Sequence, residues 1–302
     1  MTTKAVGPGH GWGWLMRAVN LGRNNPKAIF GAVAWVALIA LVPSIIQVGL
    51  QYGLKLGQGA VLSVIGATTL LSIIVYPLLI GGLLRVIDAA ENGRPTRAAA
   101  VFDTFRSGHD AGRLIGFGLL LTAIYIGLFL IIIYLFGRDF MHWYWNLITA
   151  TQANPGVPPQ IDSLPDGFGR LLGLGMLVAM FFSGVYAIGF GQVALAGRKV
   201  GEALGDGLAG TLKNVLPIVV LALIVIVGFI VLLVGFGLVA AILGAIGALI
   251  HPALAVALLL PMYFAMILAM YVVMFGVMYY MWRDICSDAA PTPAAPADQL
   301  QA

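Results

Sequence analysis

Uncharged polar side chains inside long apolar stretches are the residues of this chain best suited to bind a ligand. They carry amide and phenol groups, which can hydrogen-bond to a bound molecule or to a neighbouring helix without bringing charge into nonpolar surroundings. The groups could bind a ligand or could only hold helices together. Both interpretations stay open, since one sequence cannot say whether the groups converge. The six candidates for ligand binding are Gln47, Tyr76, Tyr125, Tyr186, Gln192 and Tyr263.

Groups that would support catalysis or metal binding form no recognisable pattern. The four histidines lie on four different segments, and Cys286 is the only cysteine, so no zinc-ligand spacing exists. Ser183 lies inside an apolar stretch with no carboxylate expected at its depth. All acidic residues fall outside the apolar stretches or at their ends, whereas a charge within one would suggest a functional site. We therefore expect no catalytic residues, no metal, no cofactor and no enzymatic activity.

The elements that must position the six candidates are long and free of charge. Between Lys213 and Arg283 there is no Lys, Arg, Asp or Glu for 69 consecutive residues. Across the whole chain, 61% of residues are hydrophobic and 9% are charged, far below the roughly 25% charged residues of soluble domains. A membrane crossing needs about 20 apolar residues and excludes unpaired charge, so the sequence predicts a membrane protein.

Six apolar stretches are long enough to cross a bilayer as helices. Their residues do not alternate between polar and apolar, which argues against strands. The fifth stretch is too long for one upright crossing and must tilt, bend or end early, with Gly244 and Gly247 as the places to end it. Pro43, Pro77 and Pro261 lie inside stretches and free backbone carbonyls there. The expected spans are residues 28 to 50, 60 to 84, 114 to 136, 171 to 196, 217 to 248 and 253 to 282.

The basic residues predict how the chain threads through the membrane. Of the 16 Lys and Arg residues, 13 lie on the side that holds both termini, and only Lys55, Arg138 and Arg170 lie on the other. Positive charge collects on the cytoplasmic side, so we expect a multi-pass protein of a bacterial inner membrane with cytoplasmic N- and C-termini. The basic residues never form one dense patch, and we expect no nucleic-acid binding.

A unit of one short amphipathic segment and two spans occurs three times. The three segments are centred on Trp14, on Phe102 and on Leu208, and each precedes a span pair. Their apolar spacing predicts helices that lie flat at the cytoplasmic interface and set the angle of the pair that follows. The fold class is therefore all-α, a polytopic membrane bundle of six transmembrane helices, interpreted as three repeats of an interfacial helix plus a helical hairpin.

Three regions follow from this division of the chain. Residues 1–13, rich in glycine, are expected to be a flexible N-terminus, residues 14–286 a six-helix transmembrane domain, and residues 287–302 a disordered cytoplasmic tail. The external segment 137–170 carries an aromatic run at Met141 to Trp145, which is typical of an interfacial anchor, and turn signals at Asn154 to Gly156 and Pro165 to Gly167.

Several short motifs resemble one family of proteins. The motifs are Gly11-Trp12-Gly13-Trp14 with Asn25-Pro26 before the first span, and Glu202-Ala203-Leu204 with Lys213-Asn214-Val215-Leu216-Pro217 before the fifth. They look like an uncharacterised family of bacterial six-helix inner-membrane proteins, broadly similar to YciC-like proteins and to the membrane domain fused to some glycerophosphodiester phosphodiesterases. The likeness extends over about residues 10 to 284, and it implies the fold but no catalytic residues.

The expected function is non-enzymatic. The absence of charge in the spans and the three interfacial segments favour a protein that handles or transports a lipid or another hydrophobic solute. The alternative is a structural or accessory subunit of a membrane complex, which small-residue helix faces would serve equally well. The expected partners are membrane lipids, with a second copy of the chain or a membrane partner protein as further candidates.

Overall fold

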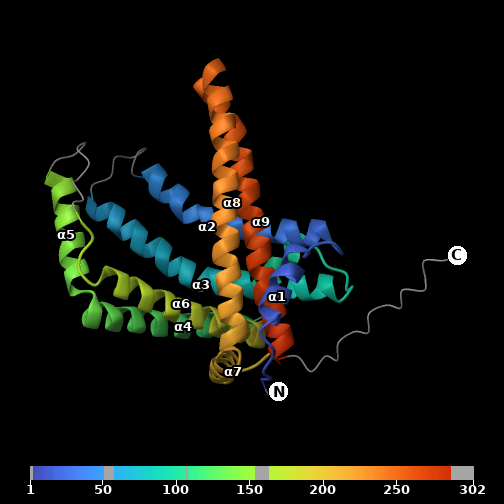
Figure 1. The fold of residues 1–302 in the computed structure, drawn as a ribbon. Helices are drawn as coiled ribbons and strands as arrows, with labels where there is room; N and C mark the ends of the chain where they lie inside the picture. Colours follow the sequence, from blue (N-terminus) through green and yellow to red (C-terminus); the bar gives the residue numbers. More distant parts are fainter. Residues whose placement is uncertain (1–2, 51–57, 107, 154–162, 287–302) are drawn as a thin grey trace.

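The computed structural model describes residues 3–50, 58–106, 108–153 and 163–286. Within these residues the regular structure is helical, and six helices are long and apolar enough to cross a membrane, which confirms an all-α, multi-pass architecture (Figure 1). The elements are α1 (His10–Val19), α2 (Pro26–Val48), α3 (Gln58–Glu91), the 3-10 helix η2 (Ala98–Phe105), α4 (Gly108–Phe136), α5 (Arg138–Ala153), α6 (Phe168–Ala194), α7 (Val200–Lys213), α8 (Val215–Ile250) and α9 (Pro252–Cys286).

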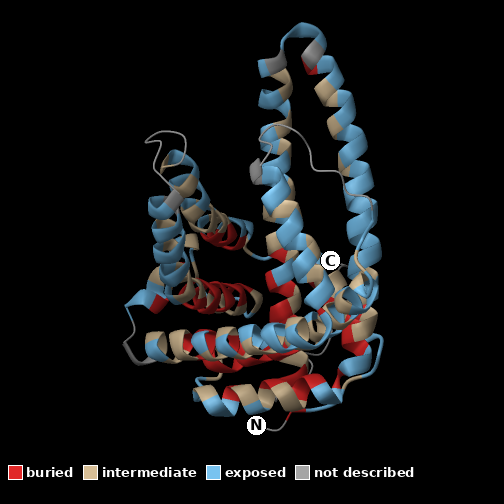
Figure 2. Ribbon diagram, turned by 90° about the vertical axis from the view of Figure 1, so that its left-hand side faces the viewer, coloured by how far each residue is buried: buried red, intermediate tan, exposed pale blue. Residues whose placement is uncertain are grey.

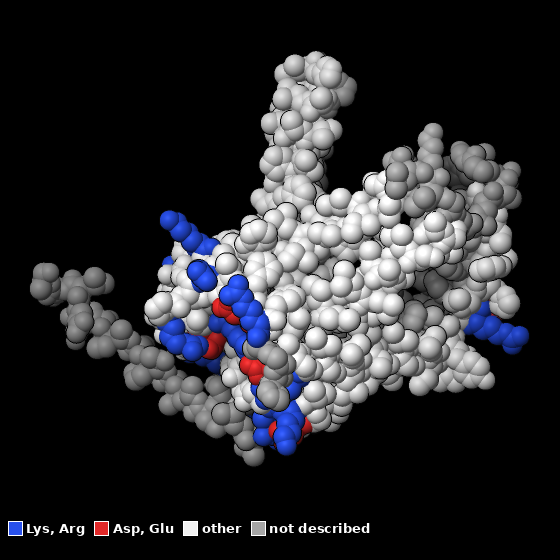
Figure 3. All heavy atoms as spheres, turned by 180° about the vertical axis from the view of Figure 1, so that it is seen from behind, with Lys and Arg blue, Asp and Glu red and all other residues white. Residues whose placement is uncertain are grey.

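The six long helices pack together at one end only. We call this region the packed end; it also contains most of the charged groups visible in Figure 3. Toward the other end the helices diverge, and the hairpin of α8 and α9 stands away from α4 and α6, with most of its length exposed (Figures 1 and 2). The buried hydrophobic side chains of the six helices lie within residues 28–36, 78–90, 114–121, 185–194, 218–221 and 272–286.

Several helix ends differ from the prediction because helices continue into the packed end. The second span was expected to end at residue 84, but its helix α3 runs to Glu91, since Val86, Ile87 and Ala90 extend its buried face. Asp88 and Glu91 lie in the added turns and accept hydrogen bonds there from tyrosines of α9. Apolar side chains are buried by protein here, so a hydropathy boundary does not mark the helix end.

Of the three alternatives for the fifth span, an early end does not occur. Helix α8 is continuous for 36 residues, from Val215 to Ile250, and passes both Gly244 and Gly247. A side chain at Gly247 would lie 2.5 Å from the backbone of Ala255 in α9. The glycine therefore permits a close approach of the two helices just before their turn, and it does not break the helix.

Segment 137–170 contains a helix that the turn signals did not predict. Helix α5 covers Arg138–Ala153 and includes the aromatic run. The ring of Phe140 stacks on Tyr144 at 6.0 Å and lies 5.8 Å from Phe168 at the start of α6. The predicted turn at Pro165 to Gly167 fits the positive φ of Gly167, and the one at Asn154 to Gly156 lies outside the described residues.

Each of the three short helices packs mainly against spans other than the pair that follows it. Helix α1 contacts α8 and α9, η2 contacts α2 and α3 and, to a lesser extent, α4, and α7 contacts α6 and, to a lesser extent, α4 and α8. The expected control over the angle of the following pair stays a prediction. No span pair precedes α1 in the sequence, and α1 packs on the last pair, α8 and α9. The three units are therefore arranged in a cycle.

Small residues allow these contacts to be close. A side chain at Gly11 in α1 would lie 2.4 Å from the carbonyl oxygen of Pro217 in α8, and one at Gly82 in α3 would lie 2.0 Å from that of Val101 in η2. At Gly207 in α7 the nearest atom would be a backbone oxygen of α6 at 3.0 Å. At all three contacts, a glycine thus allows two backbones to approach closely.

Polar side chains at the start of the first span of each pair follow the same cycle. Before α2, the Asn25 amide donates to the carbonyl of Thr96 ahead of η2, at 3.5 Å. Near the start of α4, Arg113 donates to the carbonyl of Gly197 ahead of α7. Before α8, the Asn214 amide donates to the carbonyl of Lys4 ahead of α1, at 2.9 Å. Three equivalent bonds therefore link each unit to the next, as the repeat interpretation requires.

Two further details concern the N-terminal segment and α7. In the N-terminal segment, the Val6 amide donates to Asn214 at 2.7 Å, and the Lys4 amide donates to the carbonyl of Ile285 at 3.0 Å. In α7, the face toward the protein is the small one, with Ala203, Gly207, Gly210 and Thr211 buried. The leucines of α7 lie on its half-buried to exposed side, and Leu212 is 64% exposed.

Candidate functional site

A cavity lies between α3, α4 and α6. Its volume is about 600 Å³, which is within the range of small-molecule sites. Three of the six candidates meet there, since Tyr76 comes from α3, Tyr125 from α4 and Tyr186 from α6. The sequence could identify these residues as polar but could not bring three separate helices together.

Hydroxyl groups dominate the polar lining of this cavity. They recur at intervals of three or four residues on each helix, and therefore lie on one face of it. Thr69 and Thr122 were not among the expected residues. Their helical spacing from Tyr76 and Tyr125 would have identified them. The hydroxyl-bearing residues are Thr69, Ser72 and Tyr76 of α3, Thr122 and Tyr125 of α4, and Ser183 and Tyr186 of α6.

Aromatic contacts fix two of the tyrosine rings at the cavity. The ring of Tyr125 meets Phe182 edge-on at 6.5 Å, and the ring of Tyr186 lies 4.6 Å from that of Phe190. Both tyrosines remain partly accessible, with exposed fractions of 49% and 38%. Two of the tyrosines that line the cavity are thus not fully covered by protein.

A proline and a glycine shape the wall between α3 and α4. A side chain at Gly118 would lie 2.3 Å from the ring of Pro77, so only glycine allows α4 to approach this close. Pro77 has no amide hydrogen, and the carbonyl of Ile73 one turn earlier loses its helical donor. Both residues line the cavity.

The other three candidates lie elsewhere. Gln192 is fully buried at the packed end, where it donates to Asp206 at 2.7 Å and accepts from the Trp282 indole at 3.3 Å. It therefore links α6, α7 and α9. Gln47 lies on α2 and Tyr263 on α9, and neither lines the cavity.

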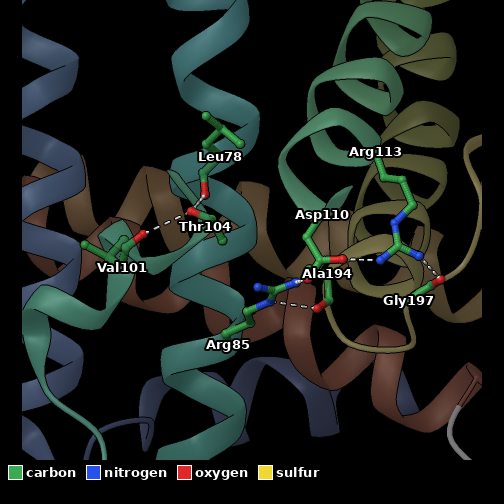
Figure 4. A network of polar contacts seen from close by, with 8 residues as sticks. All are labelled: Leu78, Arg85, Val101, Thr104, Asp110, Arg113, Ala194 and Gly197. Carbon is green, nitrogen blue, oxygen red and sulfur yellow. Dashed lines mark hydrogen bonds and ion pairs between the residues drawn. The ribbon is translucent and has the colours of Figure 1, made fainter. Parts of the chain in front are cut away.

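An ionic network holds the same three helices together toward the packed end (Figure 4). The Arg85 guanidinium of α3 donates to Asp110 of α4 and to the carbonyl of Ala194 at the end of α6, both at 3.0 Å. Arg113 also donates to Asp110. On the other side of α3, the Thr104 hydroxyl donates to the carbonyl of Leu78 at 2.9 Å. These charges pair with one another and with the backbone, and none of them lines the cavity.

The described residues contain no group of three His, Cys, Asp or Glu side chains that could hold a metal ion. Comparison with protein-family models, with curated proteins and with solved structures finds no match to this chain. The family resemblance noted from the short motifs therefore stays a prediction.

Proposed function

We propose that this protein is a non-enzymatic, multi-pass protein of a bacterial inner membrane that holds or moves a lipid or another hydrophobic solute. The observation that supports the proposal is the open cavity between α3, α4 and α6, with Tyr76, Tyr125 and Tyr186 on its walls. An apolar cavity with a few convergent polar groups is the usual form of a binding site for a small apolar molecule.

The ligand-binding role is tested by filling the cavity. Ala179 lines it from α6, so Ala179→Trp should displace a bound molecule. Leu177 lies two residues away on the same helix, is 59% exposed and does not line the cavity, so Leu177→Trp is the matched control. Native mass spectrometry of the purified proteins should detect a retained apolar molecule in the parent and in the control only. Equal retention by Ala179→Trp would overturn the proposal.

The membrane orientation is tested separately. Because 13 of the 16 basic residues lie on one side of the expected spans, reporter fusions after Arg283 and within residues 86–112 should report the cytoplasm. A fusion near Asn154 should report the outside. A C-terminus outside the cell would contradict the orientation and leave the helical fold unchanged.

A second candidate function is that of an accessory subunit of a membrane complex. The observation that favours it is the outer part of the α8–α9 hairpin, where apolar side chains such as Val231, Leu249 and Val256 are more than 60% exposed. The same mass spectra distinguish the two functions. A retained protein chain of defined mass in place of a small molecule would favour the subunit.

A further inference from the structure

We propose that the cavity between α3, α4 and α6 takes an uncharged lipid whose head carries hydroxyl or ester groups, with diacylglycerol as the simplest representative. The inference rests on the proposed function and specifies the class of ligand. It follows from the chemistry of the lining, from the depth of the hydroxyl groups within the spans and from the size of the cavity.

The lining presents both donors and acceptors of hydrogen bonds. Ser72 and Ser183 donate to carbonyl groups of their own helices, each at 2.7 Å, and keep their lone pairs as acceptors. Within the described part of the chain, the phenols of Tyr125 and Tyr186 have no hydrogen-bond partner and can donate. A head with hydroxyl and ester groups satisfies both kinds of group, because a hydroxyl donates and accepts and an ester carbonyl accepts.

The hydroxyl groups lie near the middle of their spans. Tyr76 is central in the span Leu62–Glu91, and Thr122 is central in the span Asp110–Phe136. Ser183 is close to the centre of Phe168–Ala194. The lining contains no Lys, Arg, Asp, Glu or His. A phosphate head at this depth would be a charge without a partner, which the membrane interior strongly disfavours. The head is therefore uncharged.

The size of the cavity sets how much of the lipid is enclosed. About 600 Å³ accommodates one head and part of one chain, not a complete two-chain lipid. The open side, marked by the partly exposed Tyr125 and Tyr186, lets the rest of the molecule stay in the bilayer. A small polar head can thus reach the middle of the membrane while its chains remain in hydrocarbon.

The experiment compares two probes that differ in charge. Photoactivatable diacylglycerol and photoactivatable phosphatidic acid with the same chains are presented to the purified full chain in the same detergent micelles. Labelling of the cavity-lining helices should be about a hundredfold stronger with diacylglycerol at equal concentration, because a charge in mid-membrane is disfavoured to that extent. Ala179→Trp should abolish the labelling, and Leu177→Trp should preserve it.

A second set of variants removes the hydroxyl groups and keeps the shape. Thr122→Val with Tyr125→Phe and Tyr186→Phe should lower labelling by diacylglycerol about fivefold or more, since each lost hydrogen bond contributes modestly. Tyr134→Phe is the control, because Tyr134 is 85% exposed on the same helix as Tyr125 and does not line the cavity.

The outcomes separate this inference from the proposed function. Equal labelling by the two probes, or unchanged labelling of the triple variant, overturns the uncharged head while the cavity remains a lipid site. Labelling by neither probe, or labelling that Ala179→Trp leaves unchanged, overturns both the inference and the proposed function.

Discussion

The packed end and the outer halves of the helices differ in how their geometry is fixed. At the packed end, backbones approach closely, as at Gly11 beside Pro217, and the buried amide of Asn214 is hydrogen-bonded to the backbone. In the outer halves, apolar side chains such as Leu70 and Leu249 are mostly uncovered by protein. Specific protein contacts therefore hold one end together, whereas the surrounding lipid must set the arrangement of the other.

The largest expected effect contrasts two leucines of α3. Leu83 is fully buried at the packed end, and Leu70 is 67% exposed in the outer half. Leu83→Ala should lower the free energy of unfolding by about 2 to 5 kcal/mol through lost contacts and a cavity. Leu70→Ala should change it by less than about 0.5 kcal/mol. Thermal unfolding of the detergent-solubilised variants measures both stability changes. Similar unfolding midpoints for the two variants would contradict the proposed difference between the two regions.

The next prediction concerns the apolar length of α8. Ile226 is 42% exposed in a helix that carries no charged or hydrogen-bonding side chain between Val215 and Ile250. Ile226→Arg should cost about 2.5 to 3.5 kcal/mol of membrane insertion. The measurement is the inserted fraction in membranes, with Ile226→Leu as the control. Normal accumulation of the Arg variant would mean that this position borders water.

A smaller effect is expected at the polar anchor of the N-terminal segment. The buried Asn214 side chain binds the Val6 amide, the Lys4 carbonyl and the Gly210 carbonyl. Asn214→Ala should destabilise the protein by about 2 kcal/mol, because backbone groups lose their partners. Asn20→Ala removes an exposed amide bonded only to its own helix and should be close to neutral. Proteolysis within residues 3–9 should increase in the first variant alone.

The smallest expected effect is the difference in stability loss between substitutions of the two phenylalanines of η2. Phe102 packs edge-on against Trp35 of α2 at 5.7 Å, whereas Phe105 is 42% exposed. Phe102→Ser should cost about 1.5 kcal/mol and Phe105→Ser less. Changing Arg97 and Arg106 together to Gln should lower the unfolding midpoint less than Phe102→Ser does. If Phe102→Ser unfolds at the parent midpoint, η2 is a solvated linker.

Much of the fold could be predicted from the sequence, because the bilayer acts on composition directly. The 69-residue run without Lys, Arg, Asp or Glu required membrane spans, and six candidate spans are present among the described residues. The candidate site was accessible only in part. Tyr76, Tyr125 and Tyr186 were identified as polar groups in apolar surroundings, and their neighbours Thr69 and Thr122 follow from helical spacing.

The sequence by itself determined which segments are helices in an apolar medium, since this depends on local composition and on the 3.6-residue period. Only the tertiary structure decided which helices meet. Polarity did not distinguish Gln192, which fixes Trp282 and Asp206 at the packed end, from Tyr186, which opens onto a cavity. Nor did amphipathic spacing show that α1 packs on α8 and α9, η2 on α2 and α3, and α7 mainly on α6. Glycines permit these contacts because they let two backbones approach closely. Which backbones approach one another is decided only when the helices assemble.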